Sequence, residues 1–178
     1  MRAFFILMFI ANVIVTLISL AVLPHRVAIH FGADGMANGW APNYVNALLM
    51  TGTHILLFCS LYFGHRLTFL FPLKWINLPN KEYWLSPANK ARTMEKMQTL
   101  ILQFGVVVFI FLLIVGLLTI QANLTKPVRL NLQVFYPAMG AVLACIIWWI
   151  IMYYRAFRIP GQGNNANHQM RNTTYRHP

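Results

Sequence analysis

The sequence predicts an all-α integral membrane bundle of four transmembrane helices. Of the 178 residues, 58% are hydrophobic and only 10% are charged, which is far more apolar than a soluble domain of this length. Four apolar runs, at residues 3–23, 45–64, 98–120 and 132–154, reach the roughly 20 residues that a helix needs to cross a hydrocarbon core. Residues 1–159 are therefore expected to form one membrane domain.

The positive charge is distributed asymmetrically between the two sides of this predicted bundle. The chain has 14 Lys and Arg against three acidic residues. Only Arg26, Lys126 and Arg129 lie outside the N-terminus, the loop at residues 65–97 and the segment after the fourth run. The positive-inside rule places both termini and the 65–97 loop in the cytoplasm, and the 24–44 loop outside. The basic face suits anionic lipid headgroups, so the bilayer is an expected partner and nucleic acid is not.

Both ends of the chain carry a further expectation. Arg2 and the following apolar run, with Ser19-Leu20-Ala21 near its end, could be a cleavable signal, but the run is longer than a usual signal core, so we expect a retained first helix. The tail at residues 160–178 is rich in small and amide side chains and is predicted to be a disordered cytosolic segment. Cys59 and Cys145 fall within spans, so no disulfide framework is expected.

The outer loop at residues 24–44 is predicted to be rich in turns, because Pro and Gly punctuate it throughout. Val27, Ile29 and Phe31 alternate with other residues, a pattern compatible with a short extended stretch. The same loop holds the only cluster of potential metal ligands, His25, His30 and Asp34. The favoured interpretation is structural, with His30 hydrogen-bonded and Asp34-Gly35 in a turn, so no metal or cofactor is expected.

This loop carries a family resemblance. Leu23-Pro24, Val27, His30-Phe31, Gly35 and Trp40, within LPHRVAIHFGADGMANGW, resemble the signature of domain of unknown function 1648. The string INLPNKEYWLSP is also similar to a segment of that family, which often has Pro where Ala28 stands here. The domain is similar to the N-terminal part of immunity membrane proteins that protect against sporulation-delay toxins. The resemblance implies a multi-pass protein of the bacterial cytoplasmic (inner) membrane.

Inside the predicted spans, His54 is the most informative residue, since an ionisable side chain at membrane depth is costly unless it is paired or faces a wet cavity. It is either a neutral imidazole bonded to another helix or a functional, titrating group. Small residues predict close helix contacts: Gly52 and Gly64 in the second run, and Gly140 with Ala144 in the fourth.

In the cytosolic loop, a mixture of amide, charged and aromatic side chains suggests binding of an anionic group or partner, or anchoring to the lipid surface. These residues are Asn80, Lys81, Glu82, Tyr83 and Trp84. Ser86 followed by Pro87 is a typical helix start, so the third membrane helix is predicted to begin there, well before the membrane.

The sequence contains no phosphate loop, nucleophile elbow, HExxH or CxxC element, so we expect a noncatalytic protein. The leading hypothesis is recognition of a second membrane protein or a secreted peptide through the outer loop, at His25, His30, Phe31, Asp34, Gly35 and Trp40. Two alternatives remain. One is a small transporter or proton-coupled permease component using His54. The other is an accessory subunit that packs into a larger complex through Gly140, Ala144 and the basic loop at residues 65–97.

Overall fold

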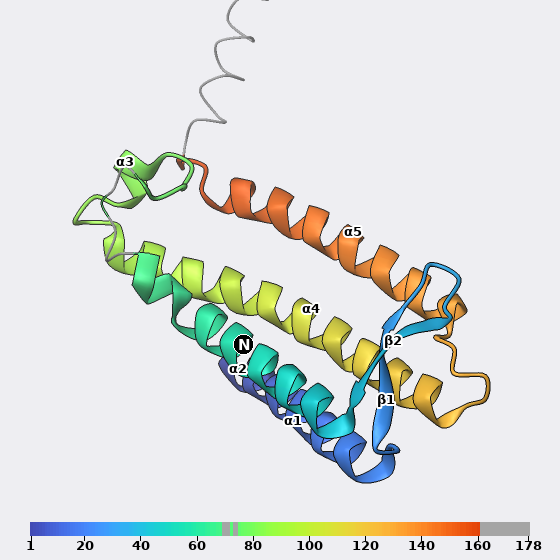
Figure 1. Cartoon of the computed structure of the whole chain (residues 1–178). Coiled ribbons are helices and arrows are strands. Elements are labelled where there is room, and N and C mark those ends of the chain that lie inside the picture. The colour runs from blue at the N-terminus through green and yellow to red at the C-terminus, as the bar shows by residue number, and fades with distance from the viewer. Residues whose placement is uncertain (69–71, 73–74, 161–178) are drawn as a thin grey trace, which may run out of the picture.

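A computed structural model describes residues 1–68, 72 and 75–160; the predicted disordered tail at residues 161–178 lies outside them. Four long helices, α1 (Arg2–Val22), α2 (Asn43–Thr68), α4 (Lys90–Leu124) and α5 (Leu132–Ala156), run side by side (Figure 1). Each is long and apolar enough to cross a membrane. A hairpin of β1 (Arg26–Phe31) and β2 (Ala37–Pro42) covers one end of the bundle, and the short α3 (Lys81–Trp84) lies at the other. The predicted four-span bundle is confirmed.

The bundle has a three-helix core formed by α1, α2 and α4. Aromatic rings fill its middle: Phe5 of α1 lies 5.4 Å from Phe58 of α2 and 5.4 Å from Phe109 of α4, measured between ring centroids. Phe9 lies 4.4 Å from Phe58 in the same way. Phe5 and Phe109 are fully buried, so this aromatic cluster joins all three helices.

A glycine that the sequence analysis passed over makes this contact close. A Cβ added at Gly105 of α4 would lie 2.4 Å from Cε2 of Phe5. The predicted small-residue contacts were wrong for Gly52, Gly64 and Gly140, where an added Cβ would meet nothing within 4 Å. A small side chain permits close approach only where a neighbouring helix lies over it, and a Cβ added at these three positions would meet no described residue within 4 Å.

The fourth membrane helix is peripheral, packing on α4 and contributing no buried residue. Its C-terminal end is instead held by the α3 segment. Phe157, which follows α5, is fully buried, and its carbonyl oxygen accepts hydrogen bonds from the indole N–H of Trp84 at 2.8 Å and the amide of Asn80 at 2.8 Å. The ammonium group of Lys96 lies 4.4 Å from the centre of the Trp84 ring.

The predicted start of the third membrane helix at Ser86-Pro87 was wrong, because α4 begins at Lys90 with Asn89 at its N-cap. The hydroxyl of Ser86 donates backwards to the Tyr83 carbonyl at 2.8 Å. The Ser86 carbonyl accepts from the backbone N–H groups of Asn89 and Lys90. Ser86 therefore ends the α3 turn instead of capping α4. The loop predicted at residues 65–97 contains the end of α2, all of α3 and the first turns of α4.

Candidate functional site

The first candidate site is the hairpin at the end of the bundle. β1 and β2 pair antiparallel, with Ala28 opposite Trp40 and His30 opposite Gly39, and the register shifts between these pairs. The extended stretch predicted around Val27, Ile29 and Phe31 is confirmed as β1. Val27 and Ala28 are both fully buried. Neighbouring residues of a strand point to opposite faces, so β1 is covered on both faces at this point.

Asn123, in the last turn of α4, closes the outer edge of β1. Its side-chain oxygen accepts from the backbone N–H of Ala28 at 2.7 Å, and its amide donates to the Ala28 carbonyl at 3.1 Å. One amide side chain thus takes the place of a neighbouring strand. The family that the loop resembles often has Pro where Ala28 stands, and Pro has no N–H to donate; this chain uses that N–H.

The tip of the hairpin is fastened to the segment between α4 and α5. The Arg129 guanidinium donates to the Asp34 carbonyl at 3.0 Å through one terminal nitrogen, and the Tyr136 hydroxyl donates to the Ala33 carbonyl at 3.0 Å. Gly35 has a φ of +81°, and an added Cβ there would lie 2.9 Å from the Leu130 carbonyl oxygen. Gly35 therefore allows the tip of the hairpin to pack closely, through its backbone, against the segment between α4 and α5.

The structure places the three candidate metal ligands of this loop against different partners. Nδ1 of His30 is hydrogen-bonded to the Asn38 side-chain oxygen. The Asp34 carboxylate accepts from the Met36 backbone N–H at 3.0 Å, as in a turn. The His25 ring lies edge-on to the Tyr44 ring. Among the residues that the structure describes, no three His, Cys, Asp or Glu side chains gather to hold a metal ion.

The outward face of the hairpin remains accessible and is partly apolar. Trp40 is 41% exposed, and Met36 is exposed to a similar degree. Phe31 is half-buried at the end of β1. Of the six outer-loop candidates from the sequence, Trp40 is the exposed large apolar side chain, and Gly35 is buried. The other exposed candidates are His25, His30 and Asp34.

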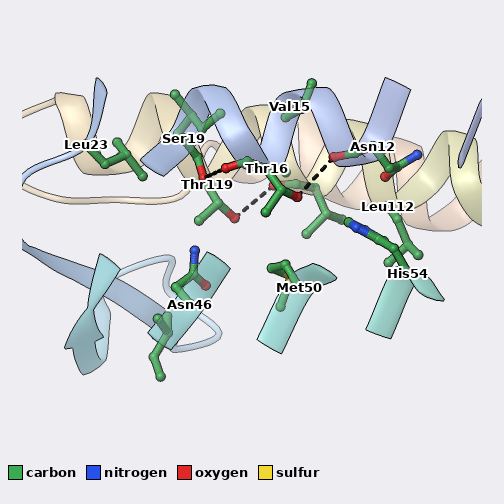
Figure 2. Close-up of a pocket in the computed structure, with 14 residues that line it drawn as sticks. Asn12, Val15, Thr16, Ser19, Leu23, Asn46, Met50, His54, Leu112 and Thr119 are labelled. Carbon is green, nitrogen blue, oxygen red and sulfur yellow. Dashed lines mark hydrogen bonds between the residues drawn. The ribbon is translucent and has the colours of Figure 1, made fainter. Parts of the chain in front are cut away.

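The second candidate site is a cavity beneath the hairpin, between α1, α2 and α4 (Figure 2). Its volume is about 140 Å³, and Ile29 of β1 is part of its wall at the hairpin end. Polar side chains from all three helices line it: Asn12, Thr16 and Ser19 of α1, Asn46 and His54 of α2, and Thr119 of α4. Of these, His54 alone was a candidate from the sequence. The helical spacing of Asn12, Thr16 and Ser19 is a sequence signal for the α1 wall, and Asn46 and Thr119 carry no such signal.

His54 lies at the deep end of the cavity, level with Asn12 and Leu112 (Figure 2). The imidazole is only 4% exposed. Its Nδ1 atom is buried and has no hydrogen-bond partner among the described residues. The expectation of a neutral imidazole bonded to another helix is therefore not met by the neighbouring side chains. Beyond His54 the aromatic cluster follows, with Phe109 6.3 Å from the imidazole centre.

The candidates Asn80–Trp84, which the sequence predicted in a cytosolic loop, are used largely for structure. Trp84 is 2% exposed, and both Trp84 and Asn80 bond the carbonyl oxygen of Phe157, as described above. Glu82 and Tyr83 remain on the surface, and Lys81 is half-buried. The geometry thus gives this segment the role of fastening α5, and leaves Glu82 and Tyr83 accessible at the surface.

Comparison with known proteins supports the family resemblance. Residues 7–53 match the model of the family described as Domain of unknown function (DUF1648). The match covers most of α1, the whole hairpin and the first part of α2, and ends one residue before His54. The INLPNKEYWLSP string lies outside it. No curated protein matches the chain, and no solved structure matches it.

Proposed function

We propose that this chain is a noncatalytic protein of the bacterial cytoplasmic (inner) membrane that recognises an extended segment of a secreted peptide through the open edge of β2. Both termini lie in the cytoplasm and the hairpin lies outside. The observation that carries the proposal is the asymmetry of the hairpin's two edges.

The two edges differ in what satisfies their backbone groups. The sheet has two strands, and Asn123 closes the outer edge of β1. An isolated bridge joins Met36, directly before β2, to Arg129, but no described strand pairs with the outer edge of β2 itself. An unpaired edge is a template for an added strand. Because Ala28 directs its N–H and C=O toward Asn123, and Trp40 stands opposite Ala28, the backbone groups of Trp40 face away from β1.

The hairpin is also preorganised for binding. Its base is fixed by Asn123 and its tip by Arg129 and Tyr136. Little conformational freedom remains to be lost when a peptide pairs with β2, which favours affinity. The exposed indole of Trp40 adds apolar area next to the edge, and Trp is common among residues that dominate binding.

The kind of partner and the orientation are supported by the sequence. The resemblance of the loop to immunity proteins that act against sporulation-delay toxins favours a secreted peptide. The excess of Lys and Arg at the helix ends opposite the hairpin favours a cytoplasmic position for the termini.

The test is binding of a dye-labelled sporulation-delay toxin peptide to the protein in nanodiscs, with exchange of backbone amide hydrogens measured in parallel. We expect binding to slow exchange at β2. Trp40→Ala removes the side chain but keeps the backbone donor, so the affinity should fall about tenfold. Trp40→Pro removes the donor as well and should weaken binding further, by about another tenfold.

Trp148→Ala is the matched control, because Trp148 is 61% exposed on α5, away from the hairpin. It should leave affinity unchanged. Absence of toxin binding would overturn the proposal. Binding without protection of β2, or with equal affinity for Trp40→Ala and Trp40→Pro, would refute recognition through the strand edge.

A further inference from the structure

The cavity beneath the hairpin has an unusual balance of hydrogen-bonding groups. Both amide hydrogens of Asn12 are used, in bonds to the carbonyl oxygens of Met8 at 2.8 Å and Phe109 at 2.9 Å. Its side-chain oxygen therefore remains as an acceptor. The amide nitrogen joins α1 to α4, so this side chain also fixes the wall that it lines.

The three hydroxyl groups in the wall are likewise left with acceptor capacity only. Thr16 donates to the Asn12 carbonyl at 3.0 Å, Ser19 to the Thr16 carbonyl at 2.7 Å, and Thr119 to the Val115 carbonyl at 2.8 Å. A hydroxyl has one hydrogen and two lone pairs. With its hydrogen spent on the helix backbone, each of these oxygens can only accept from a molecule in the cavity.

Two further polar groups in the wall lack a protein partner. Nδ1 of His54 is buried without a hydrogen bond, and the Asn46 amide has none to the described residues. Asn46 is 8% exposed and His54 is 4% exposed. Buried polar groups in folded proteins are almost always paired, so the unpartnered imidazole of His54 beside this cavity points to an occupant that pairs with it.

The wall also restricts the charge of that occupant. Among the described residues that line the cavity there is no Asp, Glu, Lys or Arg, and His54 is the one titratable residue. A charged molecule would enter a low-dielectric space without an opposite charge to stabilise it. An uncharged molecule that carries several N–H or O–H donors fits the wall better, because it can donate to the oxygens of Asn12, Thr16, Ser19 and Thr119.

We propose that this cavity is a binding site for a small uncharged solute rich in hydrogen-bond donors, which enters at the hairpin end and bonds His54 at the deep end. The polar groups extend from Asn46, near the hairpin, to His54, about 12 Å further along α2 at 1.5 Å per residue. The aromatic cluster closes the cavity beyond His54. A cavity of about 140 Å³ is close to the size that accommodates benzene, so a polyol or urea-like molecule of about six heavy atoms fits.

The site can be tested with the whole protein in nanodiscs, with nitrogen-15 in its histidine side chains. Four small probes are titrated: glycerol and urea as neutral donors, methylammonium as a cation and acetate as an anion. We expect at least one neutral probe to give a saturable shift of the His54 resonance. Neither ion should do so, and the exposed His25 should show no saturable shift with any probe.

Variants with matched controls identify the wall. Thr16→Val keeps the shape but removes the acceptor oxygen that lies one helical turn from Asn12, and it should weaken binding of the neutral probe tenfold or more. Thr53→Val is the control, because the Thr53 hydroxyl makes the same kind of bond, to the Leu49 carbonyl at 2.8 Å, but is exposed on α2 and does not line the cavity. It should leave binding unchanged.

Three results would overturn the proposal. One is that neither neutral probe gives a saturable shift of the His54 resonance, while the imidazole N–H exchanges its hydrogen with water. The cavity would then hold water only. Another is equal or tighter binding of methylammonium or acetate. The third is an effect of Thr53→Val equal to that of Thr16→Val, with the thermal stability of both variants preserved. Since toxin binding at β2 is measured separately, failure here leaves the proposed peptide recognition untouched.

Discussion

Asn123 holds both backbone groups of Ala28, accepting from the N–H at 2.7 Å and donating to the carbonyl at 3.1 Å. The two residues are 95 positions apart in the chain, and both are buried. Asn123 also donates to the Thr119 carbonyl within α4 at 3.0 Å. A single side chain thus connects the end of a membrane helix to a β-strand and sets where the hairpin sits.

Asn123→Ala should release the hairpin without unfolding the bundle. The N–H and C=O of Ala28 would be left buried and unpaired, at a cost of about 1–3 kcal/mol for each group. We expect amide exchange at Ala28 to rise at least tenfold, since about 1.4 kcal/mol corresponds to a factor of ten. Gln121→Ala, at an exposed position two residues earlier, is the control, and an equal rise in that variant would contradict this role.

Gly105→Ala should destabilise the three-helix core. The new Cβ would lie 2.4 Å from Phe5, whose ring is enclosed by Phe58, Tyr62 and Phe109 and has little room to move. Overpacking of this kind costs about 1–3 kcal/mol, which can be measured as the free energy of unfolding in detergent micelles. Gly140→Ala, where the Cβ meets nothing within 4 Å, should change stability by less than about 0.5 kcal/mol. Equal losses in the two variants would argue against this packing.

Trp84→Phe should loosen the C-terminal end of α5. The ring remains but the 2.8 Å bond from its indole N–H to the Phe157 carbonyl is lost, at a cost of about 1 kcal/mol. Cleavage by trypsin after Arg158 should become about fivefold faster in reconstituted protein. Tyr83→Phe changes an exposed neighbour and should not alter the rate. An unchanged rate for Trp84→Phe would show that Lys96 and Asn80 hold this end without it.

The charge asymmetry predicts the orientation in the membrane. In a chain with Cys59→Ala and Cys145→Ala, a cysteine placed at the exposed hairpin position Ala33 should react with a membrane-impermeant thiol reagent in intact cells. A cysteine at the exposed Ala88, in the loop before α4, should react at least tenfold more slowly until the cells are permeabilised. The reverse pattern would place the termini outside.

The four membrane helices could be predicted because the signal is local. A helix needs only enough consecutive apolar residues to cross the bilayer, and the four runs meet that length by themselves. The extended stretch at Val27–Phe31 was also visible, as alternation over a few residues. The start of α4 was not, because Ser86 has two competing hydrogen-bonding roles and the α3 turn decides between them.

The close helix contacts and the cavity depended on tertiary structure. Gly52, Gly140 and Gly105 look alike in the sequence, but only Gly105 has an aromatic ring above it. His54 was recognisable as a polar residue at membrane depth, whereas Asn12, Asn46 and Thr119 become a site only when three helices bring them together. The sequence by itself determined that this protein has helices suited to a lipid bilayer and how many of them could span it, because both follow from the length of its apolar runs. The tertiary structure alone decided which polar groups face one another, because that depends on how the helices are rotated and paired.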